Sequence, residues 1–338
     1  MAATRKSAST DPVSAAVTRC LARHVGPSDR LTVAFSGGLD STVLLHVLAA
    51  ASGCLVSAVH VHHGLSDNAD HWAEFCQETC RAWAVPCSVY RVDVERGTRD
   101  GLEAAARRAR HACYRQVAAD WIVLAHHRGD RAETTLFNIV RGAGVRGAGA
   151  MPERSGRLLR PLLDVERTEI AAYAQAHGLR WIEDESNQDI RFSRNFLRLD
   201  ILPALRQRFP SVEERLVSAA MHFAEAASLL DDLARLDLDD HPQAFPVDLE
   251  LLRRLPEPRA RNVLRFLLVI LGVGIPSERR LKEAMRQFLT AAPDRHPAVV
   301  FGSVTLKRAG RLLVLVGAND VLSQAARPPA VGRVRPPT

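Results

Sequence analysis

Up to about residue 210, short apolar runs alternate with longer segments whose apolar residues recur every three or four positions. The runs at 31–35, 54–61, 87–94 and 120–127 predict strands, and the segments at 41–52, 68–85 and 101–119 predict helices. This alternation predicts an α/β fold, with a Rossmann-like parallel sheet covered by helices on both faces. Ligands of such sheets bind beyond the carboxyl ends of the strands, so residues that follow a strand are the candidates for a site.

From residue 211 the pattern is mainly helical, and two strand-like runs follow at 298–308 and 311–317. We therefore predict a flexible lead-in over 1–25, a catalytic domain over 26–210, a smaller, mainly helical domain over 211–318 and a disordered tail over 319–338. The lead-in lacks the apolar stretch of a secretory signal, and no run is long enough to span a membrane.

Composition and charge narrow the class of protein. Of the 338 residues, 47% are hydrophobic and 25% are charged, as in soluble globular proteins. The net charge of +7 favours an anionic partner such as nucleic acid. The six cysteines include no C-x-x-C pair, which predicts reduced packing residues of a cytoplasmic protein.

The first candidate site is SGGLDS, residues 36–41, directly after the first predicted strand. Paired glycines let the backbone turn sharply, and the helix that follows presents its positive N-terminal end. The hydroxyls of Ser36 and Ser41 add hydrogen-bond donors. A plain β–α turn with a serine cap is the alternative, but it requires fewer of these residues. The segment lacks the lysine of the kinase-type phosphate loop, so we predict a different phosphate cradle.

Two further strand ends carry candidate residues. HVHHGL, residues 60–65, contains three histidines and a glycine. A zinc site formed with His126 and His127 is disfavoured, because no further cysteine or carboxylate has suitable spacing. In HHRGDRAET, residues 126–134, Asp130 and Glu133 are three apart and share one face of the first helical turn. A capping box with solvated charges is the alternative interpretation of that pair.

Arginine-rich segments and a glycine-rich segment complete the candidates. The arginines of 102–111 and 181–198 are either solvated helix faces or contacts to phosphate and RNA. A G-x-G-x-x-G pattern at 142–147 follows a predicted helix instead of a strand, so we interpret it as a flexible loop and not as a dinucleotide site.

Together with LLRPLLDVER (158–167) and ILPALRQRFP (201–210), these segments resemble the tRNA(Ile)-lysidine synthase family of PP-loop ATP pyrophosphatases. SGGLDS is typical of the superfamily, and WIEDESNQDIRFSRNFLR (181–198) is typical of the family. The resemblance implies a carbon–nitrogen ligase that uses ATP and Mg²⁺. Its substrates would be free L-lysine and an isoleucine tRNA with a CAU anticodon. ATP would adenylate C2 of the wobble cytidine and release pyrophosphate, and lysine would then displace AMP to give lysidine.

The resemblance also implies roles for single residues. The catalytic residues would be Asp40, Asp130 and Glu133. The ATP site would comprise Ser36, Gly37, Gly38, Leu39, Asp40, Ser41, His60, His62, His63, Gly64 and Arg107. Asp40 would hold the metal, Asp130 and Glu133 would bind lysine, and Arg110, Arg194 and Asn195 would contact tRNA. The family usually has Asp and Gln where this sequence has Gly129 and Arg131.

Alternative functions remain open at this point. A tRNA thiolase of the same superfamily would need a suitable cysteine pair, which this sequence lacks. A non-catalytic ATP- or RNA-binding module would not need the three carboxylates. A small-molecule synthetase would explain neither the positive charge nor the second domain. Longer family members carry a further C-terminal module, so tRNA is expected to bind basic residues after 211: Arg253, Arg254, Arg259, Arg261, Arg279, Arg280 and Lys282. The oligomeric state stays open, with a homodimer as one option.

Overall fold

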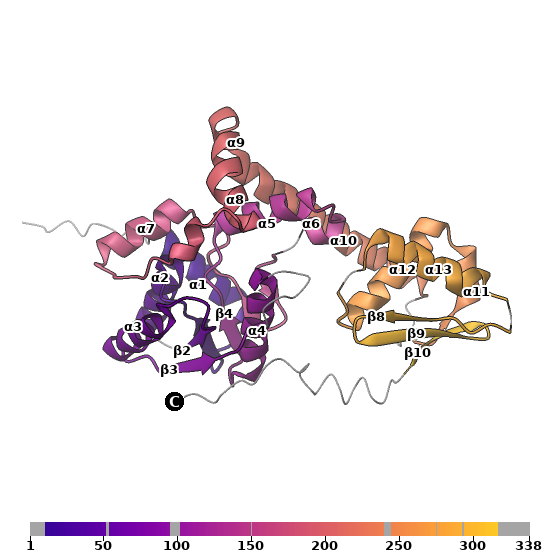
Figure 1. Ribbon diagram of the computed structural model, residues 1–338, viewed down its shortest axis with the longest axis horizontal. Helices are drawn as coiled ribbons and strands as arrows, with labels where there is room; N and C mark the ends of the chain where they lie inside the picture. Colours follow the sequence, from indigo (N-terminus) through magenta and orange to yellow (C-terminus); the bar gives the residue numbers. More distant parts are fainter. Residues whose placement is uncertain are drawn as a thin grey trace, which may run out of the picture. The chain divides into compact units, whose positions relative to one another are not determined.

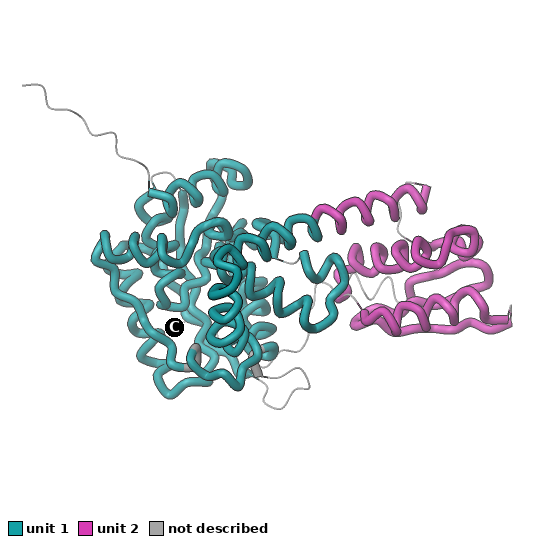
Figure 2. Tube along the Cα trace, turned by 90° about the horizontal axis from the view of Figure 1, so that it is seen from above, with its two compact units in different colours: residues 1–224, 330–338 teal, residues 225–329 magenta. Residues whose placement is uncertain are grey.

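The computed structural model describes residues 11–51, 54–94, 102–149, 151–239, 245–274, 276–292 and 294–316. The chain divides into two compact units (Figure 2). The first comprises Met1–Ala224 with Ala330–Thr338, and the second comprises Glu225–Pro329. The predicted tail over 319–338 and residues 1–10 of the predicted lead-in lie outside the described residues.

The first unit is built on a six-stranded sheet of order β3-β2-β1-β4-β6-β5 (Figure 1). All neighbouring strands pair in parallel except β5 and β6, which are antiparallel. The strands are β1 (Arg30–Ala34), β2 (Leu55–His62), β3 (Cys87–Arg91), β4 (Trp121–Val123), β5 (Arg154–Ser155) and β6 (Leu158–Leu159). The four predicted strands are therefore confirmed, although the third and fourth are shorter than expected.

Helices cover both faces of this sheet. The helices of this unit are α1 (Pro12–His24), α2 (Leu39–Ala50), α3 (Ala69–Ala82), α4 (Leu102–Gln116), α5 (Arg128–Val140), α6 (Val145–Ala148), α7 (Arg167–Ala176), α8 (Ser193–Phe196) and α9 (Leu202–Arg208), with a 3₁₀ turn η1 (Glu185–Gln188) and a π turn η2 (Leu197–Ile201). Val123 faces the core shared with α1, α2, α3 and α7, whereas Ile122 and Leu124 face a cluster that includes Tyr114 of α4. Alternating strand residues thus face opposite layers, as a buried parallel sheet requires.

The predicted lead-in was wrong for residues 12–24, which form α1. The carboxylate of Asp11 accepts the amide of Ser14 at 2.9 Å and caps the helix, and a proline occupies its first turn. Val13, Ala16 and Val17 are buried in the main core. The helical spacing of these three residues did not lead to a predicted helix, because the ten residues before the segment are mostly small or polar.

The second unit combines helices with an antiparallel sheet of order β7-β10-β9-β8. Its elements are β7 (Val247–Asp248), α11 (Leu249–Arg254), α12 (Glu257–Ile270), α13 (Glu278–Thr290), β8 (Ala298–Phe301), β9 (Val304–Ala309) and β10 (Leu312–Val316). Leu264, Phe288 and Leu306 belong to one buried core, so the three helices pack on one face of this sheet. A helix shared by both units, α10 (Val212–Asp237), contains the division between Ala224 and Glu225.

Candidate active site

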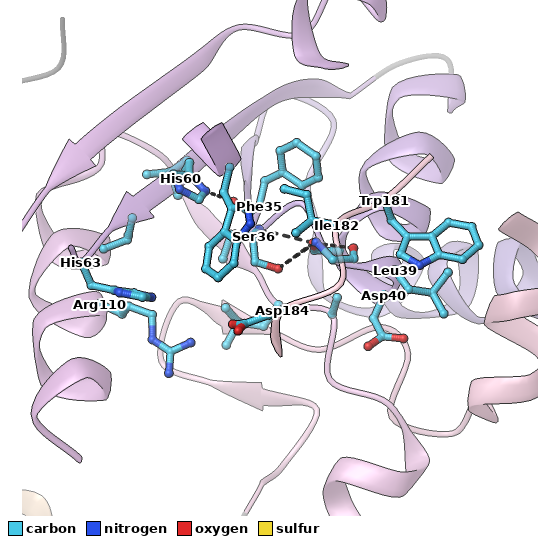
Figure 3. A pocket seen from close by; sticks show the side chains of 18 of the residues that line it. Phe35, Ser36, Leu39, Asp40, His60, His63, Arg110, Trp181, Ile182 and Asp184 are labelled. Atoms are coloured by element: carbon cyan, nitrogen blue, oxygen red, sulfur yellow. Dashed lines mark hydrogen bonds between the residues drawn. The ribbon is translucent and has the colours of Figure 1, made fainter. Parts of the chain in front are cut away.

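A cavity of about 540 Å³ lies at the carboxyl ends of β1, β2 and β4. Its lining comes chiefly from the turn after β1, the ends of β2 and β4, one face of α4, the start of α5 and residues 181–184, with further residues from α3 and α7. Figure 3 shows His63 and Arg110 on one side of this cavity, Asp40 and Trp181 on the other, and Asp184 between them. The sheet therefore gathers side chains from several separate chain segments at the edge where the sequence predicted a site.

The turn between β1 and α2 is held in an open conformation by Gly37, whose φ is +84°. An L-residue is strained at this φ. A Cβ at this position would also lie 2.7 Å from Cδ1 of Ile182 and 3.1 Å from Sγ of Cys76. The amide of Ile182 donates to the Gly37 carbonyl at 2.9 Å, so the 181–184 segment is attached directly to this turn.

The serine hydroxyls of the turn hydrogen-bond to one another. Ser41 donates its single hydroxyl proton to the Gly38 carbonyl at 3.0 Å, so Ser36 is the donor in the 3.0 Å contact between the two hydroxyls. Gly38 is the N-cap of α2, and the first amides of a helix have no partner within that helix. Two reorientable hydroxyls and a helix N-terminus therefore face one end of the cavity, which is the donor set that phosphate oxygens prefer.

Two carboxylates and a histidine lie beside this turn. Nε2 of His127 is 4.0 Å from Oδ2 of Asp40 and 3.6 Å from Oδ2 of Asp130. The backbone amide of His127 also donates to Oδ2 of Asp130 at 2.9 Å. Burial raises the pKa of Asp40, and the charge of the neighbouring Asp130 adds to that effect. Oδ1 of Asp40 is buried and has no hydrogen-bond partner among the described residues. Among the sequence predictions His127 appears only in the disfavoured zinc site.

Glu133 lies behind this group and does not line the cavity. Its Oε1 is 3.1 Å from Nη1 of Arg194, which also contacts the Thr134 hydroxyl at 3.2 Å. The guanidinium carbon of Arg194 lies 5.0 Å from the centre of the Phe137 ring. Burial raises the pKa of Glu133, and the charge of Arg194 partly opposes that effect. The structure therefore brings together two residues that were predicted to bind different substrates, and it pairs them with each other.

The opposite side of the cavity is cationic. Arg107 and Arg110 line it from α4, together with His63 and His111. Burial and then Arg107 and Arg110 lower the pKa of His111 to about 4. Burial and Arg110 likewise lower the pKa of His63. Burial is the larger cause of both shifts, but the contribution of the arginine charges indicates a positive potential here, which suits an anionic ligand.

Two family models match the chain. Residues 12–205 match the PP-loop domain, and residues 248–313 match the TilS substrate binding domain. The tRNA(Ile)-lysidine synthase of Nitrosomonas europaea is 44% identical over 286 residues, which are 82% of this chain and 62% of that protein. The enzyme of that name from Alkalilimnicola ehrlichii is 42% identical over 300 residues, 85% of this chain and 67% of that protein. This chain belongs to the tRNA(Ile)-lysidine synthase family.

The chain spans 62% to 67% of the length of four curated tRNA(Ile)-lysidine synthases that it matches. Among solved structures, the U34-tRNA thiolase NcsA from Methanococcus maripaludis with its [4Fe-4S] cluster aligns with a TM-score of 0.52. The two sequences are 16% identical, and the alignment covers 63% of this chain and 78% of that one. At this identity the likeness shows a common fold and nothing about substrates.

Most residues that the family resemblance assigned to ATP line the cavity. These are Ser36, Gly38, Leu39, Asp40, Ser41, His60, His62, His63 and Arg107, together with Arg110 and Asp130 from the other predicted groups. Gly37, Gly64, Glu133, Arg194 and Asn195 do not line it. The amide of Asn195 donates to the Asp189 carbonyl at 2.9 Å, and its side chain is buried. The Asn195 side chain, which was predicted to contact tRNA, is therefore not exposed in this structure.

Trp181 and Ile182 line the cavity, although the predictions for residues 181–198 concerned only acidic residues, arginines and Asn195. Two apolar residues beside a charged run are a weak signal, because the same pattern occurs where a loop simply packs on a core. Gly129 and Arg131, where the sequence departs from the family, lie just outside the cavity. Nη1 of Arg131 lies 3.9 Å from Oδ1 of Asp164.

The donor atoms of the cavity suit one way in which proteins hold Mg²⁺. Among the described residues, no three His, Cys, Asp or Glu side chains are arranged to hold a metal ion. Mg²⁺ commonly uses one or two carboxylates together with substrate phosphates and water. Oδ1 of Asp40 is buried without a partner in the described part of the chain and lies next to the turn whose hydroxyls and amides suit phosphate, so Asp40 fits a Mg²⁺ ion shared with substrate phosphates.

His60 gives the site a pH-dependent stability. Its Nδ1 donates to the Phe35 carbonyl at 3.0 Å, and burial lowers its pKa to about 4 from an ordinary 6.5. The neutral form is therefore favoured in the fold. Neutral His60 therefore contributes fully to the free energy of unfolding above pH 6.5, and this contribution is lost as the pH falls toward 4. The shift of the His60 pKa corresponds to a loss of unfolding free energy on the order of 3 kcal/mol.

We expect His60→Asn, which keeps a donor near Nδ1 but does not titrate, to lose less unfolding free energy than the wild type over this pH range. Tryptophan fluorescence during urea unfolding is suitable, because Trp72, Trp83, Trp121 and Trp181 all belong to the first unit. Equal pH slopes for the two proteins would contradict this assignment.

Proposed function

We propose that this chain is a tRNA(Ile)-lysidine synthase, which ligates L-lysine to C2 of the wobble cytidine of CAU-anticodon tRNA(Ile) and releases AMP and pyrophosphate. The proposal is supported chiefly by the single cavity that combines the SGGLDS turn, the Asp40 and Asp130 carboxylates and the cationic side chains of α4. Membership of the family supports the choice of substrates.

In this proposal the turn binds the pyrophosphate end of ATP. Backbone amides at the start of α2 and the hydroxyls of Ser36 and Ser41 would hold the phosphate oxygens. Asp40 would hold Mg²⁺ with those oxygens, and the bound ion would neutralise part of the charge that develops on the leaving group. His60, His62 and His63 at the end of β2 would border the adenosine side of the cavity. Arg107 would contact the triphosphate.

Lysine would approach from the carboxylate side. Asp130 faces the cavity and would receive the lysine ammonium, and Glu133 would join it once Arg194 moves to another partner. The attacking amine must first lose a proton, since the pKa of free lysine is about 10.4. Burial raises the pKa values of Asp40 and Glu133, which makes these carboxylates better proton acceptors than exposed ones.

The tRNA would be held by both units. In the first unit, Arg110 is exposed at the cavity and Arg194 lies beside Glu133. In the second unit, Arg259 pairs with Asp237, and Nε of Arg261 lies 2.9 Å from Oε1 of Glu278. Arg279 and Lys282 are exposed near the start of α13 and are the better candidates for phosphate contacts.

We expect the double reversal Arg279→Glu/Lys282→Glu to weaken tRNA binding about tenfold and to lower the salt dependence of the affinity by about two counterions. Binding measured at several salt concentrations tests this. The control is Arg19→Glu/Arg81→Glu, which makes the same charge change at exposed positions of the first unit. Equal effects of the two variants would assign tRNA binding to overall charge instead of α13.

Three further parts of the proposal are the use of Mg²⁺, a cytoplasmic location and the option of a homodimer. Within the described part of the chain, no helix is long and apolar enough to cross a bilayer. Metal dependence of pyrophosphate release and sedimentation of the purified chain would test the first and the third.

The deciding experiment is ATP-dependent incorporation of labelled lysine into CAU-anticodon tRNA(Ile), with methionine tRNA as the control. Incorporation into the first tRNA only, with one AMP and one pyrophosphate released per lysine, would support the proposal. ATP and tRNA binding without incorporation would instead favour a non-catalytic binding module. A tRNA thiolase is not favoured, because the six cysteines of the sequence include no C-x-x-C pair.

A further inference from the structure

His127 occupies an unusual position between two carboxylates that repel one another. Its ring is buried, with Nε2 3.6 Å from Oδ2 of Asp130 and 4.0 Å from Oδ2 of Asp40. These two distances are longer than hydrogen bonds, as is common for active-site contacts before a ligand binds. Each carboxylate would otherwise face the negative charge of the other across the cavity wall.

The other ring nitrogen determines where the proton of His127 lies. The backbone amide of Gly129 donates to Nδ1 at 3.0 Å, so Nδ1 is an acceptor and carries no proton. In the neutral ring the single proton is therefore on Nε2, the nitrogen that faces both carboxylates. The ring thus directs its Nε2–H group toward Asp40 and Asp130, at distances beyond hydrogen-bond range in this structure.

The residue at position 129 makes this ring orientation sterically allowed. A Cβ added to Gly129 would lie 2.8 Å from Cε1 and 3.2 Å from Nδ1 of His127. Any other residue would therefore push the ring away from its place over the Gly129 backbone. The ring is the far end of a side chain and can move at little cost, so the change would affect the orientation of His127 more than the stability of the fold.

We propose that His127 is a positioning residue that holds Asp40 and Asp130 at a fixed separation through its Nε2–H group, and that Gly129 permits this orientation. The inference rests on the proposed function, because Asp40 and Asp130 act there on ATP and lysine. It adds a residue pair, His127 and Gly129, that determines the geometry of both carboxylates.

Kinetics of four variants test the proposal. We expect His127→Ala to lower kcat for lysidine formation 10- to 100-fold, the usual range (roughly) for residues that orient ligating groups, with KM for tRNA unchanged. His127→Gln keeps an N–H near the Nε2 position and should recover much of this loss. Gly129→Ala should also lower kcat, but it should have no further effect when His127 is already Ala.

Matched controls exclude general effects of these substitutions. No atom lies within 4 Å of a Cβ added at Gly274, and His71 is exposed on α3. Gly274→Ala and His71→Ala should therefore keep wild-type kcat. Additive losses from His127→Ala and Gly129→Ala, or equal rates of His127→Gln and His127→Ala, would overturn the proposal.

Nitrogen NMR of histidine-labelled protein tests it without any turnover. The signal that disappears in His127→Gln should show a proton on Nε2 in the wild type, and Gly129→Ala should change that signal. A proton on Nδ1 would overturn the proposal. If this NMR signature is found but wild-type protein makes no lysidine, the proposed function fails while the arrangement of His127 stands.

Discussion

Asp40→Asn is expected to reduce lysidine formation at least about 100-fold, the scale of losing one electrostatic group aimed at a reacting centre. Asp40 lies in the first turn of α2, and its buried Oδ1 has no partner among the described residues. The amide of asparagine has nearly the same shape but no charge to hold Mg²⁺ or balance the reacting groups. Release of pyrophosphate in the presence of ATP, lysine and tRNA measures the effect.

The same variant should fold normally. Burial raises the pKa of Asp40, so the ionised form is disfavoured in the fold and a neutral amide should keep or increase the free energy of unfolding at pH 7. Asp93→Asn, at an exposed position after β3, is the control and should be fully active. Near-normal turnover by Asp40→Asn would remove Asp40 from the mechanism.

Gly37→Ala is expected to weaken ATP binding more than about tenfold, because it changes the turn that carries the phosphate donors. The backbone has φ +84°, where an L-residue costs roughly 1–2 kcal/mol. The new Cβ would in addition meet Cδ1 of Ile182 at 2.7 Å and displace the attached 181–184 segment. Calorimetric titration with ATP measures the loss.

Gly142→Ala separates the two causes. Gly142 has φ +74°, but nothing lies within 4 Å of an added Cβ. Gly142→Ala should lower the free energy of unfolding by the cost of an L-residue at this φ, and it should bind ATP normally. Adding Ile182→Ala to Gly37→Ala should restore part of the affinity by removing the collision. If Gly37→Ala binds ATP as well as Gly142→Ala, the turn does not hold the phosphates.

The fold of the first unit could be predicted because the sequence patterns of its strands and helices each lie within a short stretch of chain. A buried parallel strand needs a short apolar run, and a covering helix needs apolar residues every three or four positions. Both patterns are visible in 31–35 and 41–52, which correspond to β1 and α2. The helix α1 was missed because its apolar spacing follows a polar stretch. The paired strands β5 and β6 have two residues each, too few for any period to be visible.

The sequence by itself determined that phosphate-type donors, histidines and carboxylates follow successive parallel strands, and parallel strands end at one edge. Only the tertiary structure decided which of these groups meet. Asp130 and Glu133 share a helix turn, yet one lines the cavity and the other pairs with Arg194, 61 residues further along the chain. The ring of His127 is oriented between Asp40 and Asp130 by an amide two residues away. Spacing along the chain determines the face of an element, but contacts between elements depend on packing in three dimensions.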